Sequence, residues 1–306
     1  MKRLGFAPFV EGLDNLIEGG VPEGSWLSIF GPPGGFKTLH SLAFCLAGVI
    51  KGEKCVYVST EMDRAQLKGQ LDSLEWKMDD VYEVLFTSKI TENEDYGSFD
   101  LVWVDLDSLR YWAYKLNALF REEKKKSKDE RKKIKWFWYN DPSLLMHVIM
   151  IALGGVGVLE RTVKDITLEE VLYARVKDGL YGKSKYTRFT VNKDVSARVI
   201  IDSISPFVIG KYAVAGQIMT DMKVRLVAPN VTYIIISHVA KTTEDELGAS
   251  IGHITDGRIK LWMDLDMKAE IAKHYGWIVK MRMTDHSRRL HRVSIEGTDI
   301  KKIVWK

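Results

Sequence analysis

The sequence predicts an α/β fold with a mostly parallel central sheet that is covered by helices on both faces. Two observations lead to this prediction. Short apolar segments alternate with longer segments of helical character along most of the chain. The short segments are apolar almost throughout, which is typical of parallel strands buried on both faces. We expect one domain over residues 1–306, with residues 99–161 forming a helical and basic insertion within it.

The predicted elements follow each other in strand–helix order. Residues 25–30 form a short apolar strand that leads through glycines into a buried helix. Asp107 is placed to cap a helix, and residues 167–170 resemble a capping box that opens another helix. Strands are predicted at 25–30, 54–59, 81–87, 99–105, 198–203 and 232–238, and helices at 38–50, 63–76, 107–120 and 217–226.

Two further segments complete the plan. Residues 275–283 and 290–296, joined by a polar turn, predict a C-terminal β-hairpin. The apolar run 144–153 is too short to span a bilayer. We favour a buried helix for this run. The alternative interpretations are an interfacial membrane anchor and a face that binds a partner.

Composition limits the class of protein. Apolar and charged fractions of 46% and 28% are ordinary for a soluble globular chain. Cys45 and Cys55 show no metal-ligand spacing and are expected to be buried free thiols in a reducing compartment. The first residues lack an apolar signal segment, so we expect a cytoplasmic protein. Three Gln and two Cys in a chain rich in Lys and Glu favour a thermophilic source.

Charge is unevenly placed. The net charge is +4, and residues 121–140 hold nine Lys or Arg against four Asp or Glu, which is +5. The other residues therefore sum to −1, so global charge does not indicate a nucleic-acid partner.

The glycine-rich turn after the first apolar strand has the pattern of a phosphate-binding P-loop, G-x-x-x-x-G-K-[ST]. Backbone N–H groups of such a loop point at the phosphates, and the helix dipole adds to their attraction. Lys37 would neutralise the phosphate oxygens, and Thr38 would ligate Mg²⁺. The residues expected to contact ATP are Gly31, Pro32, Pro33, Gly34, Gly35, Phe36, Lys37, Thr38 and Leu39.

Phe36 is the one departure from this pattern, because a glycine is expected there. A side chain at this position would strain the loop or screen the phosphates, since glycine alone tolerates positive φ and close approach. Gly34 and Gly35 are expected to supply the backbone conformational freedom instead.

An acid at the end of a neighbouring strand is needed to hold Mg²⁺. Residues 199–202 end in Asp202 after three apolar residues, and residues 102–105 end in Asp105 in the same way. We favour Asp202, because it is followed by a helix and another strand, whereas either acid could be a strand-ending turn residue.

Hydrolysis also needs a group that orients or deprotonates water. Glu61, after the second strand, is the candidate general base. Ser237 and His238 end a later strand and would sense the γ-phosphate. A lone Ser-His pair is more often structural, and Glu61 could simply favour a helix N-terminus.

Five segments in order make the chain resemble the KaiC-like and RadA-like branch of the RecA-superfamily ATPases. They are GLDNLIEGGVPEGS at 12–25, YVSTE at 57–61, VIIDSISPF at 199–207, GHITDGRIKL at 252–261 with Ser237 and His238 before it, and KMRMTDHSRRLHR at 280–292. The resemblance implies a RecA-like P-loop NTPase core. It covers about 240 residues and leaves out the 99–161 insertion.

The resemblance also implies an oligomeric ATPase, a ring of hexameric type or a filament, with the nucleotide between subunits. Lys280 and Arg282 would then reach the γ-phosphate of the neighbouring subunit, where cations stabilise the transferring phosphoryl group. Without the resemblance, they are a charged edge hairpin. Met62 replaces the second of the paired glutamates that the family often carries.

Three functions are compatible with this pattern. The first is a Mg²⁺-dependent ATPase acting on DNA in recombination, repair or signalling, in which residues 121–140, with Trp136, Trp138 and Tyr139, track phosphates and stack bases. The alternative is a nucleotide-gated scaffold with weak hydrolysis whose 99–161 insertion binds a protein partner or a membrane surface. Autophosphorylation is disfavoured, because the duplicated two-domain arrangement of the clock proteins is absent.

Overall fold

The computed structural model describes residues 1–76, 84–86, 100–126, 138, 140–159, 191–208, 212–239, 250–266 and 271–306. An eleven-stranded sheet runs through the described part of the molecule in the order β2-β13-β12-β11-β10-β4-β9-β8-β5-β7-β6. The seven strands from β10 to β6 all run parallel to one another. The predicted α/β fold with a mostly parallel sheet is therefore confirmed.

Most of the predicted strands begin and end within two residues of the strands in the structure. They are β1 Arg3–Leu4, β2 Val10–Glu11, β3 Val21–Pro22, β4 Trp26–Gly31, β5 Lys54–Ser59, β6 Val84–Phe86, β7 Leu101–Val104, β8 Ala197–Asp202, β9 Val231–His238, β10 Gly257–Asp266, β11 Ile271–Met281, β12 Leu290–Glu296 and β13 Lys302–Trp305. The long strand β10 and the short strands near the two termini were not predicted.

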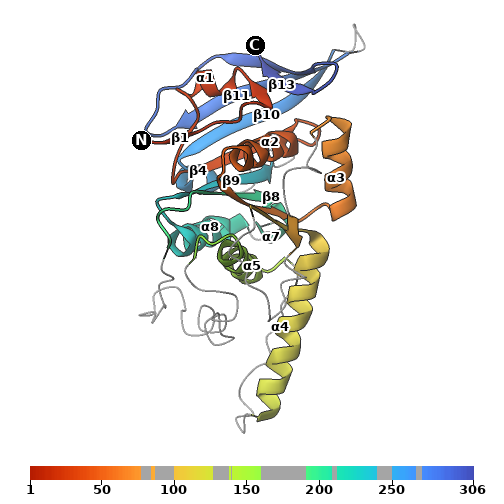
Figure 1. Cartoon of the computed structure of the whole chain (residues 1–306), viewed down its shortest axis with the longest axis vertical. Coiled ribbons are helices and arrows are strands. Elements are labelled where there is room, and N and C mark those ends of the chain that lie inside the picture. The colour runs from red at the N-terminus through yellow and green to blue at the C-terminus, as the bar shows by residue number, and fades with distance from the viewer. Residues whose placement is uncertain are drawn as a thin grey trace.

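The helices are α1 Leu13–Leu16, α2 Lys37–Ile50, α3 Arg64–Ser73, α4 Leu106–Lys126, α5 Pro142–Gly155, α7 Ser205–Val208, α8 Tyr212–Leu226 and α9 Ser250–Ile254. Figure 1 shows α2 and α3 on one side of the sheet and α5 and α8 on the other, so helices cover both faces as predicted. α4 starts at the sheet and extends far from the body of the molecule.

Local sequence explains where the helices begin. α3 opens with a capping box, in which the Asp63 side chain accepts from Gln66 N–H and the Gln66 side chain accepts from Asp63 N–H. α5 opens with Asp141 as its cap and Pro142 in its first turn. The buried-helix interpretation of residues 144–153 is confirmed, because the side chains of α5 pack into the core against the sheet.

Two hydrophobic clusters lie on the two faces of the sheet. One joins α4, α5 and α8 to β5, β7, β8 and β9, and the other joins α1, α2 and α3 to β4, β10, β11 and β13. Side chains of the parallel strands are buried on both faces, and Trp26 of β4 stacks on Tyr233 of β9 with 4.2 Å between ring centroids. This double burial explains why the strand segments are apolar throughout.

The C-terminal strands turn antiparallel. β10 pairs with β11, β11 with β12 and β12 with β13, all antiparallel, so the predicted terminal hairpin is confirmed and extended on both sides. The predicted helix near residue 167 lies outside the described residues. β7 pairs with β5 and β6 as part of the main sheet, and the boundaries of the 99–161 insertion stay a prediction.

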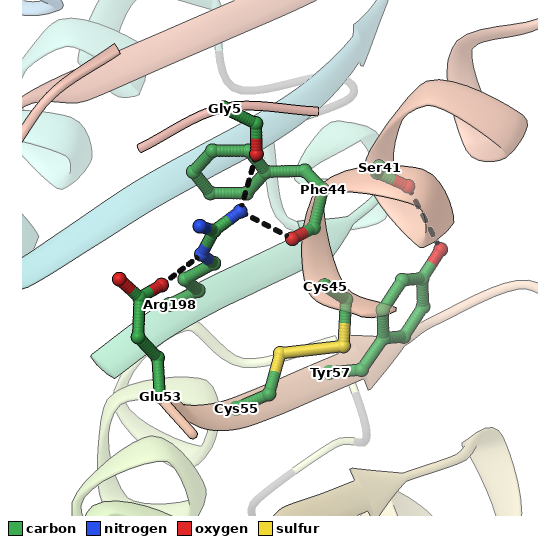
Figure 2. Close-up of a disulfide and its surroundings, with 8 residues drawn as sticks. All are labelled: Gly5, Ser41, Phe44, Cys45, Glu53, Cys55, Tyr57 and Arg198. Carbon is green, nitrogen blue, oxygen red and sulfur yellow. Dashed lines mark hydrogen bonds and ion pairs between the residues drawn. A yellow bond between two sulfur atoms is a disulfide. The ribbon is translucent and has the colours of Figure 1, made fainter. Parts of the chain in front are cut away.

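The two cysteines correct the prediction of free thiols. Cys45 of α2 and Cys55 of β5 form a disulfide, with their Cα atoms 6.0 Å apart (Figure 2). Both residues are buried and only ten positions apart, so no spacing signal marked them. The inference from free thiols to a reducing compartment is withdrawn, and the cytoplasmic location and thermophilic source stay predictions.

Among the helices of the described ranges, none has the length and apolarity to cross a membrane.

Candidate functional site

The P-loop lies between the end of β4 and the start of α2, pressed against β10. Gly31 has a φ of 150°, and a Cβ there would overlap the backbone oxygen of Leu261. A Cβ on Gly35 would lie 2.9 Å from the same oxygen. Only glycine fits at these two positions, because the backbone of β10 occupies the space of a side chain.

Phe36 itself takes the left-handed conformation, with φ 63° and ψ 19°, and is the residue before α2. Gly34 also has a positive φ of 82°, so both residues contribute to the turn that was assigned to glycines alone. The left-handed conformation costs a non-glycine residue about 1–2 kcal/mol. The Phe36 ring stacks on His274 of β11, with centroids 3.9 Å apart, which offsets part of this cost.

His40 holds the same loop from inside the core. Its Nδ1 lies 2.8 Å from the Phe36 carbonyl oxygen, and its Nε2 accepts from Trp305 Nε1–H at 2.9 Å. Because indole only donates and a carbonyl only accepts, the ring must be neutral with its proton on Nδ1. Burial lowers the pKa of His40 to about 4, which keeps this form.

Lys37 points back into the loop. Its Nζ donates to the Pro32 carbonyl oxygen at 2.7 Å, and the residue is buried. Burial lowers the pKa of Lys37 to about 8, and the charges of Asp202 and Glu61 act in the opposite direction. The ammonium thus lies within the glycine-rich loop and near two carboxylates.

Asp202 ends β8 beside the start of α2. Its Oδ2 accepts from the Tyr57 hydroxyl at 2.8 Å, and the Thr38 side chain also hydrogen-bonds to the carboxylate. Burial raises the pKa of Asp202, while the bonds from Tyr57 and Thr38 lower it. A buried carboxylate next to a threonine hydroxyl is a suitable donor set for Mg²⁺, which takes one or two carboxylates and completes its shell with phosphates and water.

The described residues hold no group of three or more His, Cys, Asp or Glu side chains that could bind a metal alone. A Mg²⁺ ion shared with phosphates needs no such group. The competing acid, Asp105, has a different role. Its Oδ1 accepts from the backbone N–H and the hydroxyl of Ser108 at 2.8 and 2.6 Å, so it caps α4.

Glu61 lies across the site from the P-loop, after β5. Its Oε1 accepts from the Ser203 hydroxyl at 2.6 Å and lies 3.0 Å from His238 Nε2. The bond to His238 is the main reason why the pKa of Glu61 is lowered, and the bond to Ser203 adds to it. The carboxylate is therefore ionised and able to accept a proton.

Ser237 and His238 occupy different places. His238 ends β9 and reaches Glu61, whereas Ser237 is buried inside β9 opposite Phe30 of β4. Leu39, in the first turn of α2, is partly buried against the core, and Met62 packs on the same cluster after Glu61. Pro33 and Gly34 form the exposed tip of the loop.

Lys280 and Arg282 lie at the other end of the sheet. Met281 pairs with Gly257, and Gly257 lies beside Leu27, four residues before Gly31. At the rise of a strand, this separates them from their own P-loop by roughly 13 Å or more. Lys280 Nζ donates to the carbonyl oxygens of Gly252 and Thr255, at 3.1 and 2.6 Å, and Arg282 lies 3.4 Å from Asp256.

Several residues of the site were not predicted. Tyr57 and Ser203 contact the two acids, His274 supports Phe36, and His40 and Trp305 hold the loop from below. No role was assigned to these residues, although Tyr57 and Ser203 lie in the segments 57–61 and 199–207 and Ser203 directly follows Asp202. Of the aromatic residues suggested for nucleic acid, Trp138 is 70% exposed, and Trp136 and Tyr139 lie outside the described residues.

Comparisons with known proteins bear on the family and the fold. The family model described as ATPase: KaiC matches residues 7–111 and 184–306. A UPF0273 protein of Methanopyrus kandleri is 26% identical over 297 residues, which is 95% of this chain and 89% of the relative. A UPF0273 protein of Thermotoga maritima is 26% identical over 291 residues, covering 95% and 92% of the two chains.

A solved structure supports the fold. The crystal structure of a KaiC-like protein from Pyrococcus horikoshii superimposes with a TM-score of 0.59 at 19% identity, covering 100% of this chain and 99% of that one. The DNA repair and recombination protein RadB of Methanobrevibacter smithii matches only 54 residues at 46% identity, which is 18% of this chain and 23% of RadB. Because the family model matches well over half of the residues, the chain belongs to the KaiC family of ATPases.

Proposed function

We propose that the protein binds ATP with Mg²⁺, hydrolyses it, and does so in an oligomer whose neighbouring subunit supplies Lys280 and Arg282. One observation carries the first part of this proposal. Lys37 with Thr38, Asp202 and Glu61 come from three places in the sequence and meet at the carboxyl ends of β4, β8 and β5. Ligands of open α/β sheets bind at this edge.

Each residue then has a distinct task. The loop amides and Lys37 bind the phosphates, and Lys37 exchanges the Pro32 carbonyl for phosphate oxygens. Mg²⁺ held by Thr38 and Asp202 would neutralise charge on the transferring phosphoryl group. Glu61 takes the proton of the attacking water. Both of its described hydrogen bonds end on Oε1, so Oε2 is left to face the water.

The position of the two cations supports the shared site. Lys280 and Arg282 lie at the end of the sheet opposite their own P-loop, so they serve a phosphate only if another subunit brings it to them. A head-to-tail contact of this kind produces a closed ring or a filament.

The test is ATP binding by calorimetry set beside phosphate release with Mg²⁺. Glu61→Gln should lower phosphate release by about 10²–10⁴-fold because the general base is lost. Binding should change little, since the P-loop is intact. Lys37→Ala should weaken ATP binding by about 10- to 100-fold, which corresponds to a lost charged hydrogen bond.

Asp202→Asn and Asp105→Asn form a matched pair that identifies the metal ligand. Asp202→Asn should abolish Mg²⁺-dependent turnover. Asp105→Asn should leave both turnover and stability nearly unchanged, because asparagine caps a helix about as well as aspartate. Equal loss of turnover in both variants, or ATP binding that survives Lys37→Ala unchanged, would refute the assignment.

A further inference from the structure

One face of the C-terminal strands carries three aromatic rings side by side with basic side chains. We call it the aromatic face. In the pairing of β10, β11 and β12, Lys260 lies beside Trp277 and Leu290, and Trp262 lies beside Tyr275 and Arg292. Successive side chains of a strand alternate between faces, so these rows point to the same side. Its members are Lys260, Trp262, Asp264, Lys273, Tyr275, Trp277, Leu290 and Arg292.

This face is open, whereas the opposite face of the same strands is buried. Gly276, Ile278, His291 and Val293, which alternate with its members, are all buried. Trp277 is 40% exposed and Leu290 is 55% exposed. Neither hydrophobic cluster of the described chain includes the three rings. Trp262 and Tyr275 are partly exposed. Contiguous apolar side chains that reach the surface of a sheet mark a binding surface.

We infer that the aromatic face binds single-stranded nucleic acid. Every base has a π-face that can stack on Trp or Tyr, and sheets with aromatic side chains on adjacent strands are a common platform for this contact. Trp262 and Tyr275 are 5.8 Å apart at an interplanar angle of 31°. Trp277 lies one row further, about 7 Å along the strand.

The spacing of the rings favours a single strand over a duplex. Bases in a duplex are stacked on each other at 3.4 Å, so none presents its face to a ring outside. Bases spread over rows about 7 Å apart must be unstacked, which a single strand allows.

The charges of the face favour a polyanion over a second copy of this chain. Lys260, Lys273 and Arg292 lie among the rings with one acid, Asp264, which lies beside Lys273 in the strand register. Further along the same rows, Asp266 ends β10, and Glu296 ends β12 and forms an ion pair with Lys306. Lys260 Nζ lies 5.6 Å from the centroid of the Trp262 ring, so a cation and a stacking surface are adjacent. Two copies meeting through this same face would bring like charges together, whereas phosphates would complement them.

The face is separate from the proposed ATP site. His274 of β11 and Met263 of β10 lie side by side on the other side of the sheet, where His274 stacks on Phe36 and Met263 lies near Gly34 of the P-loop. Residues of the aromatic face can therefore be changed without touching the groups assigned to nucleotide binding.

The test is fluorescence anisotropy of a labelled oligothymidine of about 15 nucleotides, which exceeds the site of one such platform. Trp277→Ala should weaken binding by about tenfold, the loss of one stacked base. Trp277→Phe should retain most of the affinity, because a ring remains. Trp138→Ala removes the exposed tryptophan near the basic segment, and it should bind like the unchanged protein.

Salt dependence and mass complete the test. Arg292→Gln should reduce the slope of log K against log salt by about 0.7, the value for one phosphate contact of a single strand. An unlabelled duplex should compete poorly. The inference is overturned if Trp138→Ala lowers affinity and Trp277→Ala does not. It is equally overturned if Trp277→Ala lowers the oligomer mass in sedimentation, because the face is then a contact between copies.

Discussion

His147 shows what burial does to a single titratable residue. It lies in α5, its ring contacts Trp112 edge-on at 5.9 Å between centroids, and its Nδ1 has no hydrogen-bond partner among the described residues. Burial lowers the pKa of His147 to about 4, with no opposing contact. In the native state the His147 ring therefore stays neutral down to about pH 4, whereas in the unfolded chain it binds a proton near the ordinary histidine pKa of about 6.5.

This difference makes stability pH-dependent. Between about pH 6.5 and pH 4 the unfolded chain binds more protons at this residue than the native protein, so stability falls as the pH falls. His147→Leu keeps a similar volume and removes the effect. The free energy of unfolding of the variant, measured relative to the unchanged protein, should be about 2–3 kcal/mol more favourable to the folded state at pH ~4.5 than at pH 8.

Denaturant unfolding of both proteins at the two pH values measures this gain. The measurement at pH 8 is the internal control, because the ring is neutral in both states there. A stability difference that is the same at both pH values would contradict the argument. His40 contributes a similar dependence in both proteins and cancels in the comparison.

At the scale of elements, β13 at the end of the chain supports the P-loop near its beginning. Trp305 donates to His40, and His40 holds the Phe36 carbonyl, so three residues connect β13 to the start of α2. The Phe36 ring stacks on β11 as well. The nucleotide site thus depends on strands that contribute no residue to its chemistry.

Trp305→Phe tests this connection because it removes only the indole N–H and part of the ring. The buried Nε2 of His40 then lacks a donor, which should cost about 1–3 kcal/mol of stability. We expect ATP affinity to fall by about threefold to tenfold, because part of the binding free energy must then be used to order the P-loop.

Thermal unfolding and ATP calorimetry measure the two effects. Trp277→Phe is the matched control, since that tryptophan lies on the open face of β11 and should leave ATP affinity unchanged. Reduced stability with unchanged ATP affinity would show that Trp305 serves packing alone.

At the scale of the whole molecule, the separation of Lys37 from Arg282 predicts complementation between subunits. A Lys37→Ala subunit lacks a working P-loop, and an Arg282→Ala subunit lacks one of the two cations offered to its neighbour. Each variant alone should hydrolyse ATP slowly. An equal mixture should recover activity at about a quarter of its sites. Each site takes its P-loop from one subunit and its cations from the neighbour, and in a random mixture each of these two parts is intact in about half of the cases.

Phosphate release after mixing and re-equilibrating the two variants checks this expectation. Sedimentation with and without ATP and Mg²⁺ confirms that subunits exchange. No recovery in a mixture that demonstrably exchanges would place Arg282 outside the reaction.

Much of the fold and of the site could be predicted from local sequence. The alternation of apolar strands and helices predicted β4, α2, β5, α3, β8, β9 and the terminal hairpin, because burial on both faces leaves a signal that can be read residue by residue. Asp202 was preferred to Asp105 from its context, and the structure finds Asp105 capping α4.

The rest depends on contacts between distant segments. The disulfide between Cys45 and Cys55 forms because β5 returns alongside α2. Ser203 reaches Glu61 because β8 lies next to β5 in the sheet, and Trp305 reaches His40 because β13 lies over α2. None of these neighbours is fixed by the spacing of residues along the chain.

The sequence alone determined that this chain is an α/β protein with a P-loop, and it predicted a metal-binding acid and a glutamate base, because each belongs to a short segment whose own composition dictates its local structure. Only the tertiary structure decided which residues support that loop, where Lys280 and Arg282 lie, and that three aromatic rings share one open face. The physical reason is strand order: the neighbours of a side chain in a sheet come from whichever strands pair beside it, and that pairing is settled by packing of the whole chain.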